Sequence, residues 1–312
     1  MAEFNDHLFT SMKNRKKYGS KNEKSMIVKL LFRYMILVLL FLLFCFKSKS
    51  ELSKNIICAT HTEIIFEDEY ITVTRNWDEK SATYYYLSRI RHKDNKGNLL
   101  ELKMDTSIYN MGEAVIDFAH RKGKPIIAFN ASTGVIIGNN EYRKSPGTLI
   151  LNGKIIRQKE YANYAIGIKA DNELVSYPKG ITPQEMVNEG VVNGFSVFTP
   201  LILNYEPVSS SVIALVPNQL NKNPRQVIAQ FENKDILVFS CGGRGFDGEG
   251  MKATDVIRIL QGLKDKICFA HNLDGGGSVS TVIYGNQITR MIDGNGTLNR
   301  IRPTFLYIEK NK

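Results

Sequence analysis

The chain has 312 residues, 43% of them hydrophobic, and a formal net charge of +10. The charge is unevenly distributed. Residues 1–50 hold ten Lys or Arg and three acidic residues, whereas residues 51–312 hold 31 basic and 28 acidic residues. A nucleic-acid-binding domain carries its basic surface on the folded part of the chain. The composition therefore argues against nucleic acid as a partner, and the length suffices for one large core.

The first element in chain order is an apolar segment. Residues 34–46 form an unbroken apolar run, and tolerance of Lys29 and Arg33 extends it back to residue 26. The stretch 26–46 is long enough to cross a bilayer as a helix, with the two cations reaching toward the interface. Six Lys or Arg residues precede it. The positive-inside rule then places the N-terminus in the cytoplasm.

These features predict a single-pass cell-membrane protein. Its parts are a basic cytoplasmic tail (1–25), a transmembrane signal anchor (26–46), a stalk (47–62) and an extracytoplasmic domain (63–312). A cleaved signal peptide is the alternative, because the strictly apolar run is short. The sequence directly after that run is Lys-Ser-Lys-Ser, which lacks a small-x-small cleavage pattern. An uncleaved anchor is therefore favoured.

The outer domain begins with strand patterns. Residues 63–66, 70–75 and 83–87 alternate between apolar and polar side chains, and 94–98 form a turn cluster. A helix is predicted over 112–122, where apolar residues recur at helical spacing.

Three buried-type strands, 126–129, 236–239 and 267–270, each run directly into a polar or glycine-rich loop. A helix at about 253–264 joins the second strand to the third. A strand, a helix and a second strand in succession predict a crossover unit with parallel strands. Ligand sites of such units lie at the carboxyl edge of the sheet, where both loops emerge.

That edge brings two loop residues together. Arg244 follows the second of these strands and Asp274 follows the third, so we expect them to be neighbours in space. A hairpin over 279–292 and a last strand at 304–308 complete the domain. The predicted class is α+β: a mixed β-sheet with packed helices, in a single compact domain after an N-terminal transmembrane helix.

The loop 271–278 reads His-Asn-Leu-Asp-Gly-Gly-Gly-Ser. Three consecutive glycines are costly in backbone entropy unless the backbone needs close approach or positive φ. Their amides are suited to surround an anion, although a plain glycine-rich turn is the simpler alternative. No Lys follows the glycines, and Gly242-Gly243-Arg244-Gly245 lacks dinucleotide-binding spacing. Walker-type and Rossmann-type nucleotide sites are therefore excluded.

The stretch 272–278 resembles the hallmark of the phosphodiester glycosidase family. Weaker blocks follow the family order and extend the resemblance over about 110–308; they lie at 129–130, 165–168, 194, 199–202, 243–244, 249–251 and 301–303, the last being a closing Arg-Pro. Three positions depart from the family pattern. Ala131 begins a stretch that has lost a Gly-Gly-Phe-Phe, Asn163 replaces a common Arg, and Gly242 replaces the acid of an Asp-Gly-Arg segment.

The resemblance implies hydrolysis of a sugar-1-phosphodiester at the anomeric carbon. Such a reaction needs cations or amides for the phosphate and carboxyl groups for acid, base or nucleophile work. Arg244 and the glycine amides are expected to hold the phosphate. Asn130 and Asn272 are expected to orient sugar hydroxyls. The candidate catalytic residues are Asp274, Arg244 and Asn130, and the candidate substrate-binding residues are Asn272, Gly275, Gly276, Gly277, Ser278, Asp247 and Glu249.

Extracytoplasmic placement and the resemblance together predict an envelope substrate, namely a carbohydrate or sugar-phosphate polymer such as a teichoic acid or exopolysaccharide. No cofactor is implied. A non-catalytic glycan-binding module of the cell envelope is the alternative function, consistent with the lost acid and the lost Arg. A metal-dependent phosphodiesterase is a third hypothesis, in which Asp247, Glu249 and Asp274 would bind a divalent cation through their carboxylate oxygens. The spacing of these residues in the sequence does not support a metal site.

Overall fold

The computed structural model of the chain describes residues 62–137, 142–144, 147–159 and 164–311. All of them belong to one unit, Thr60–Lys312. The predicted tail, anchor and almost the whole stalk lie outside the described residues. Within the described part, no helix is long and apolar enough to cross a membrane.

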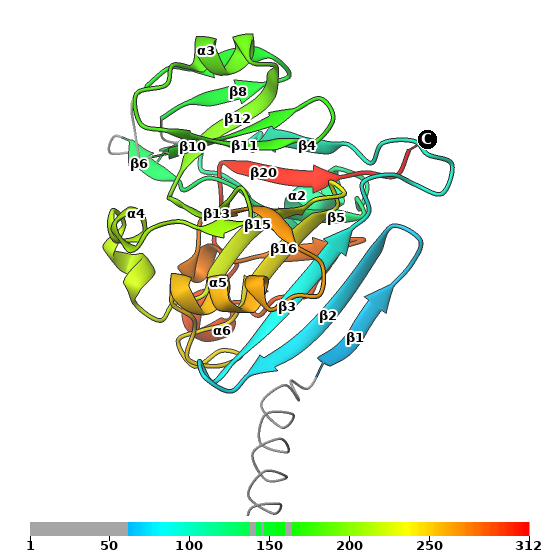
Figure 1. Cartoon of the computed structure of the whole chain (residues 1–312), viewed down its shortest axis with the longest axis vertical. Helices are drawn as coiled ribbons and strands as arrows, with labels where there is room; N and C mark the ends of the chain where they lie inside the picture. The colour runs from blue at the N-terminus through cyan, green and yellow to red at the C-terminus, as the bar shows by residue number, and fades with distance from the viewer. Residues whose placement is uncertain (1–61, 138–141, 145–146, 160–163, 312) are drawn as a thin grey trace, which may run out of the picture. The chain divides into compact units, whose positions relative to one another are not determined.

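Three antiparallel sheets make up most of the domain (Figure 1). The largest has eight strands in the order β1-β2-β3-β16-β15-β17-β13-β14. Its strands are β1 (Thr62–Glu67), β2 (Ile71–Asp78), β3 (Thr83–Ile90), β13 (Pro200–Leu203), β14 (Glu206–Pro207), β15 (Arg225–Phe231), β16 (Ile236–Cys241) and β17 (Ile267–Asn272).

Two five-stranded sheets accompany it. The first has the order β11-β10-β12-β8-β9, and the second the order β19-β18-β5-β20-β4. The first contains β8 (Leu149–Leu151), β9 (Lys154–Arg157), β10 (Tyr164–Lys169), β11 (Leu174–Pro178) and β12 (Val191–Val197). The second contains β4 (Leu102–Thr106), β5 (Ile127–Asn130), β18 (Thr281–Ile283), β19 (Asn286–Gln287) and β20 (Thr304–Ile308). A two-stranded ribbon consists of β6 (Val135–Ile137) and β7 (Tyr142–Lys144).

The helices are short and cover the outer faces of the sheets. They are α2 (Val115–Arg121), α3 (Pro183–Asn188), α4 (Ser210–Ala214), α5 (Ala253–Gln261) and α6 (Asp293–Gly296), with the 3-10 turns η1 (Pro217–Leu220) and η2 (Gly276–Ser278). The capping box between Thr182 and Glu185 begins α3. Because the longest helix among the described residues has nine residues, the described domain is mostly β, and the expected α+β class overestimates its helical content.

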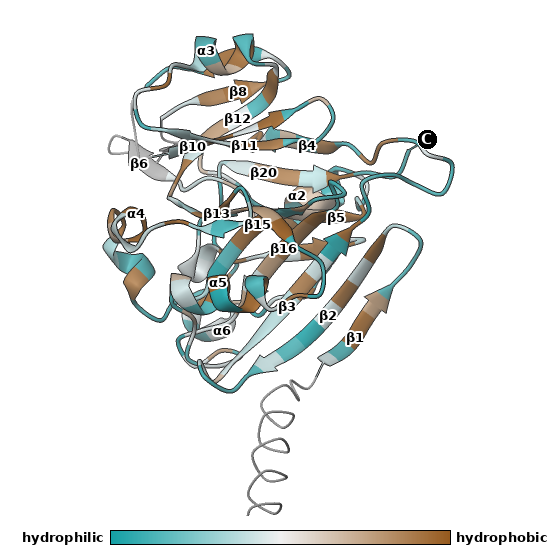
Figure 2. Cartoon of the chain, in the orientation of Figure 1, coloured by the Kyte–Doolittle hydropathy of each residue, from teal (hydrophilic) through white to brown (hydrophobic). Residues whose placement is uncertain are grey.

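The main core lies between the eight-stranded sheet and the two smaller sheets. Side-chain alternation along β15 and β16 produces it. Ile228 and Val238 join this core, while Val227 and Phe239 point to the other face, where α5 packs. Figure 2 shows brown, apolar residues along much of β15 and β16, and mixed teal and brown along β2 and β3 nearer the edge. A sheet buried on both faces needs apolar residues at consecutive positions.

The expected mixed sheet is wrong, because the described strand pairs are all antiparallel. The strands on either side of α5, β16 and β17, do run in the same direction. They are not neighbours, because β15 lies between them and is antiparallel to both. The crossover therefore spans one intervening strand. Cys241 and Asn272, the last residues of β16 and β17, pair with Arg225 and Val227 at the beginning of β15.

Several local predictions are confirmed. The last strand is β20, the helix of 253–264 is α5 with Val256, Ile257 and Leu260 buried, and the hairpin of 279–292 is β18 paired with β19. The helix of 112–122 is α2, which ends before Gly123 at φ +77.

Replacing Phe118 tests the packing of α2. Its ring is fully buried and lies 4.2 Å from Phe305 and 5.3 Å from Tyr307 between ring centroids. We expect Phe118→Ala to lower the free energy of unfolding by about 3–5 kcal/mol, measured by chemical denaturation. Tyr109, an aromatic residue that is 59% exposed, is the control: Tyr109→Ala is expected to change it by less than about 0.5 kcal/mol. Equal effects would contradict this core assignment.

Candidate functional site

A cavity of about 210 Å³ opens at the edge where β16 and β17 end. It is bordered by the glycine loop, by three arginines and by the segment that carries η1. The described residues that line it are Phe198, Val216, Asn218, Gln219, Asn223, Arg225, Arg244, Leu273, Asp274, Gly275, Gly276 and Arg300. Asp274 is the single carboxylate in this set. A second cavity of about 150 Å³, near Lys159 and Lys179, has no carboxylate among its described lining residues.

Close approach requires two of the three glycines of the loop, and backbone conformation favours glycine at the third. A Cβ at Gly275 would lie 2.7 Å from the carbonyl oxygen of Pro224, and one at Gly277 would lie 2.0 Å from Asp293 Oδ1. Gly276 has φ +63, a conformation that favours glycine. The loop backbone therefore runs against its neighbours with no room for side chains, which is more than an ordinary turn needs.

Arg244 lies against this loop, as the sequence predicted. A Cβ on Gly276 would be 3.1 Å from Arg244 Nη2, and both residues line the cavity. Arg244 is exposed and has a left-handed backbone with φ 58. Its guanidinium has no hydrogen bond or ion pair to any described residue. A strained backbone that presents an unpaired cation is typical of ligand-binding positions.

Asp274 is held in a buried ion pair. Its Oδ2 lies 2.7 Å from Nη1 of Arg302, and the two side chains are 11% and 4% exposed. Burial raises the pKa of the Asp274 carboxyl above its usual value, against the opposing effects of Arg302, Ser278 and Arg300. A buried carboxyl with a raised pKa next to a specific charge partner is typical of a functional position.

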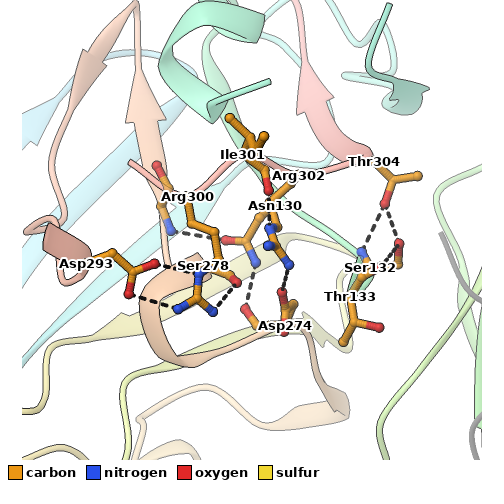
Figure 3. A network of polar contacts seen from close by, with 11 residues as sticks. Asn130, Ser132, Thr133, Asp274, Ser278, Asp293, Arg300, Ile301, Arg302 and Thr304 are labelled. Atoms are coloured by element: carbon orange, nitrogen blue, oxygen red, sulfur yellow. Dashed lines mark hydrogen bonds and ion pairs between the residues drawn. The ribbon is translucent and has the colours of Figure 1, made fainter. Parts of the chain in front are cut away.

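A second arginine extends this polar network (Figure 3). Arg300 makes a bidentate contact with Asp293, at 2.6 Å and 2.8 Å, and donates to the Ser278 hydroxyl at 3.4 Å. Ser278 in turn hydrogen-bonds Asp274. The network therefore connects α6, η2 and the segment before β20 around one carboxylate.

The two asparagines differ in their surroundings. Asn130 is fully buried; its Nδ2 donates to the backbone oxygen of Asp274 at 2.6 Å, and its Oδ1 accepts from the backbone of Ser280 at 3.0 Å. Asn130 therefore braces both sides of the glycine loop. Asn272 is buried, and its Nδ2 has no partner among the described residues. Burial lowers the pKa of the adjacent His271 to about 3, so its ring is neutral.

The structure places Asp247 and Glu249 outside the cavity lining. Asp247 accepts from the Tyr86 hydroxyl at 2.8 Å and lies 3.6 Å from Arg75. Glu249 is exposed and forms an ion pair with Lys222. Across the described residues, no three His, Cys, Asp or Glu side chains form a group that could hold a metal. The metal-dependent reading therefore gains no support from these acids.

Arg300 and Arg302 were missed as individual site residues. In the sequence, Arg302 is recognisable only as part of the closing Arg-Pro block. Two arginines at alternate positions directly before a buried strand could have indicated a pair of cations at the site. Their carboxylate partners, seven and 28 residues away in sequence, depend on tertiary structure.

The departure at Gly242 has a steric reason. A Cβ there would lie 2.2 Å from the backbone oxygen of Phe246 and 2.5 Å from Asp247 Cβ. An acid therefore does not fit at this position on the present backbone. Asn163, the other departure in charge, lies outside the described residues.

A model of the phosphodiester glycosidase family matches residues 123–309, more than half of the chain. Among curated proteins, the chain is 24% identical over 254 residues to the SPbeta prophage-derived uncharacterized protein YomE of Bacillus subtilis (strain 168). That match covers 74% of this chain and 38% of the relative, so the chain spans less than half of that protein's length.

Solved structures share the fold. The catalytic domain of zebrafish N-acetylglucosamine-1-phosphodiester alpha-N-acetylglucosaminidase, auto-inhibited by its pro-peptide, matches with a TM-score of 0.61 and 17% identity. The match covers 81% of this chain and 88% of that one. A hypothetical protein from Synechocystis matches with a TM-score of 0.62 and 14% identity, covering 80% and 64%.

A substitution at Gly242 tests the steric argument. We expect Gly242→Ala to lower the free energy of unfolding by about 1–3 kcal/mol, because the methyl group meets a backbone oxygen that cannot move freely. Gly262 is the control: its φ is −81 and a Cβ there would make only 3.4 Å contacts. Gly262→Ala is expected to change the free energy of unfolding by less than about 1 kcal/mol. Wild-type stability of Gly242→Ala in denaturant unfolding would refute the steric account.

Proposed function

We propose that this chain, which belongs to the phosphodiester glycosidase family, hydrolyses the bond between a sugar and phosphate in a sugar-1-phosphodiester. The observation that carries the proposal is the meeting of Arg244, Asp274 and the glycine loop in one cavity. The solved zebrafish relative is named for such a reaction.

The phosphate end of the substrate is assigned to Arg244 and the adjacent loop. The Arg244 guanidinium has no partner among the described residues, and its planar donors suit phosphate oxygens in a bidentate contact. It lies against Gly276, whose neighbouring amides can add further donors to an anion. These donors would stabilise negative charge as it accumulates on the departing phosphate.

The sugar end of the substrate is assigned to Asp274. Cleavage at an anomeric carbon passes through an oxocarbenium-like transition state, which a carboxyl group assists as acid, base or nucleophile. Asp274 is the single carboxylate among the described lining residues. A phosphate monoester leaves as a stable anion, so Arg244 can assist departure by charge where other glycosidases use a second carboxyl group.

A glycan-binding function at the same cavity is the second candidate. The observation that favours it is the single carboxylate among the described lining residues, because most glycosidases use a pair. The two functions differ in turnover, since a binding module retains its sugar-phosphate ligand unchanged.

The cellular setting is also proposed. The apolar stretch 26–46 and the basic residues before it support a signal anchor with the domain outside the cytoplasm. The substrate would then be an envelope carbohydrate or sugar-phosphate polymer. A reporter fused after residue 312 tests the orientation: periplasmic or extracellular activity is expected, and cytoplasmic activity would refute it.

Substitutions at the two proposed reactive residues test catalysis. We expect Asp274→Asn to lower kcat by about 10²–10⁴-fold, because the carboxyl group is removed. Arg244→Met is expected to lower kcat by about 10²–10³-fold, because charge on the departing phosphate loses its counterpart. The measurement is release of free sugar from a panel of sugar-1-phosphodiesters by the full chain.

Two exposed residues outside the cavity lining provide matched controls. Asp117→Asn and Arg290→Met make the same chemical changes. Both are expected to retain wild-type rates. Full hydrolysis by Asp274→Asn would overturn the catalytic assignment. Ligand binding without turnover by the wild type would favour the binding module.

A further inference from the structure

We propose that Arg302 is a positioning residue for the reaction: it holds the Asp274 carboxylate in one orientation and supplies the charge that balances it. The inference rests on the proposed function, because Asp274 is taken as the reacting carboxyl group. It adds a residue that does not line the cavity and has no assigned role.

The backbone of Arg302 is fixed on both sides. Its amide donates to the Glu113 carbonyl at 2.8 Å, and its carbonyl accepts from the Glu113 amide at 3.1 Å. Gly112 packs directly on it: a Cβ there would lie 2.9 Å from the Arg302 carbonyl oxygen. Arg302 Nε also donates to the carbonyl of Ile301 at 2.6 Å. The guanidinium therefore has little freedom to leave Asp274.

The neighbouring cations are committed elsewhere or lie farther away. Arg300 forms its ion pair with Asp293, not with Asp274. Arg225, which lines the same cavity, donates to backbone carbonyls such as that of Met251. Arg244 faces the cavity from the loop after β16, without an ion pair to a described residue. The ion pair of Asp274 within the described part of the chain is thus the one with Arg302.

The described residues that hydrogen-bond Asp274, apart from Arg302, are neutral. Ser278 hydrogen-bonds the carboxylate from η2, while Asn130 and Ala131 contact only the backbone of Asp274. Because both side chains are buried, removing the cation would leave an uncompensated buried carboxylate, which is disfavoured. Removing Arg302 is therefore expected to shift Asp274 toward its protonated form.

The test compares Arg302→Met and Arg302→Lys in the full chain with a methyl sugar-1-phosphodiester, chosen as one that the wild type hydrolyses. The limb of the profile of kcat against pH that reports the titration of Asp274 is identified as the one that disappears in Asp274→Asn. In Arg302→Met this limb is expected to move to higher pH, because loss of a nearby cation raises the pKa of a carboxyl group. The kcat is expected to fall at least about tenfold, while KM changes less.

The lysine variant separates charge from geometry. Lys retains the positive charge but lacks the planar fork that reaches both Ile301 and Asp274. In Arg302→Lys we expect kcat to fall about tenfold with little movement of the limb. This variant decides the proposal if Arg302→Met does not fold. Wild-type kcat in a folded Arg302→Lys, or an unmoved limb in a folded Arg302→Met, would overturn the proposal.

A control breaks another arginine–aspartate ion pair with a similar distance between its charged atoms. Arg258 lies 2.8 Å from the buried Asp78, at the opposite face of the eight-stranded sheet from the main core. Arg258→Met is expected to lower thermal stability without moving the pH–rate limb. A limb that moved equally in this variant would assign the shift to general loosening, and would overturn a specific role for Arg302.

Failure of the proposed function has a separate signature. If the wild type hydrolyses no member of the substrate panel, the titration of Asp274 is measured directly by infrared spectroscopy. The carboxylate absorption of Asp274 is obtained at each pH as the difference between the spectrum of the wild type and that of Asp274→Asn. A higher midpoint for the titration of Asp274 in Arg302→Met would still support the positioning role of Arg302. An unchanged midpoint would overturn that role independently of turnover.

Discussion

The position of β15 between β16 and β17 determines where the candidate site of this domain lies. Because β15 is antiparallel to both neighbours, the ends of β16 and β17 lie at the same edge of the sheet. The Arg244 loop leaves one end and the glycine loop leaves the other. Close contacts with Pro224 and Asp293 then leave no room for side chains on Gly275 and Gly277. A cation, amides and a carboxylate meet there because strand order brings them together.

The buried Asp274–Arg302 pair ties that edge to the second five-stranded sheet. Arg302 precedes β20, and Asn130 ends β5, so the glycine loop is held from two neighbouring strands of this sheet. Such a contact contributes specificity more readily than stability, since both charges give up hydration to form it. Its value in this molecule lies in placing one carboxyl group in a cavity with an unpaired guanidinium.

Local sequence patterns were sufficient for elements such as α5 and β20, because helical spacing and a buried apolar run are local properties. They also predicted that Arg244 and Asp274 meet, since a helical crossover fixes the relative direction of its two strands. The insertion of β15 between those strands was not predictable, because strand pairing depends on distant segments. For the same reason the sequence does not show where the Asp247 side chain lies, three residues after Arg244: its carboxylate accepts a hydrogen bond from Tyr86 on β3 and lies outside the cavity lining.

The most direct test is a crystal structure of the full-length Asp274→Asn variant with a sugar-1-phosphodiester bound. The account predicts phosphate oxygens within hydrogen-bond distance of the Arg244 guanidinium and the loop amides, with the anomeric carbon facing residue 274. A ligand bound at another surface, with this cavity empty at saturating concentration, would contradict it.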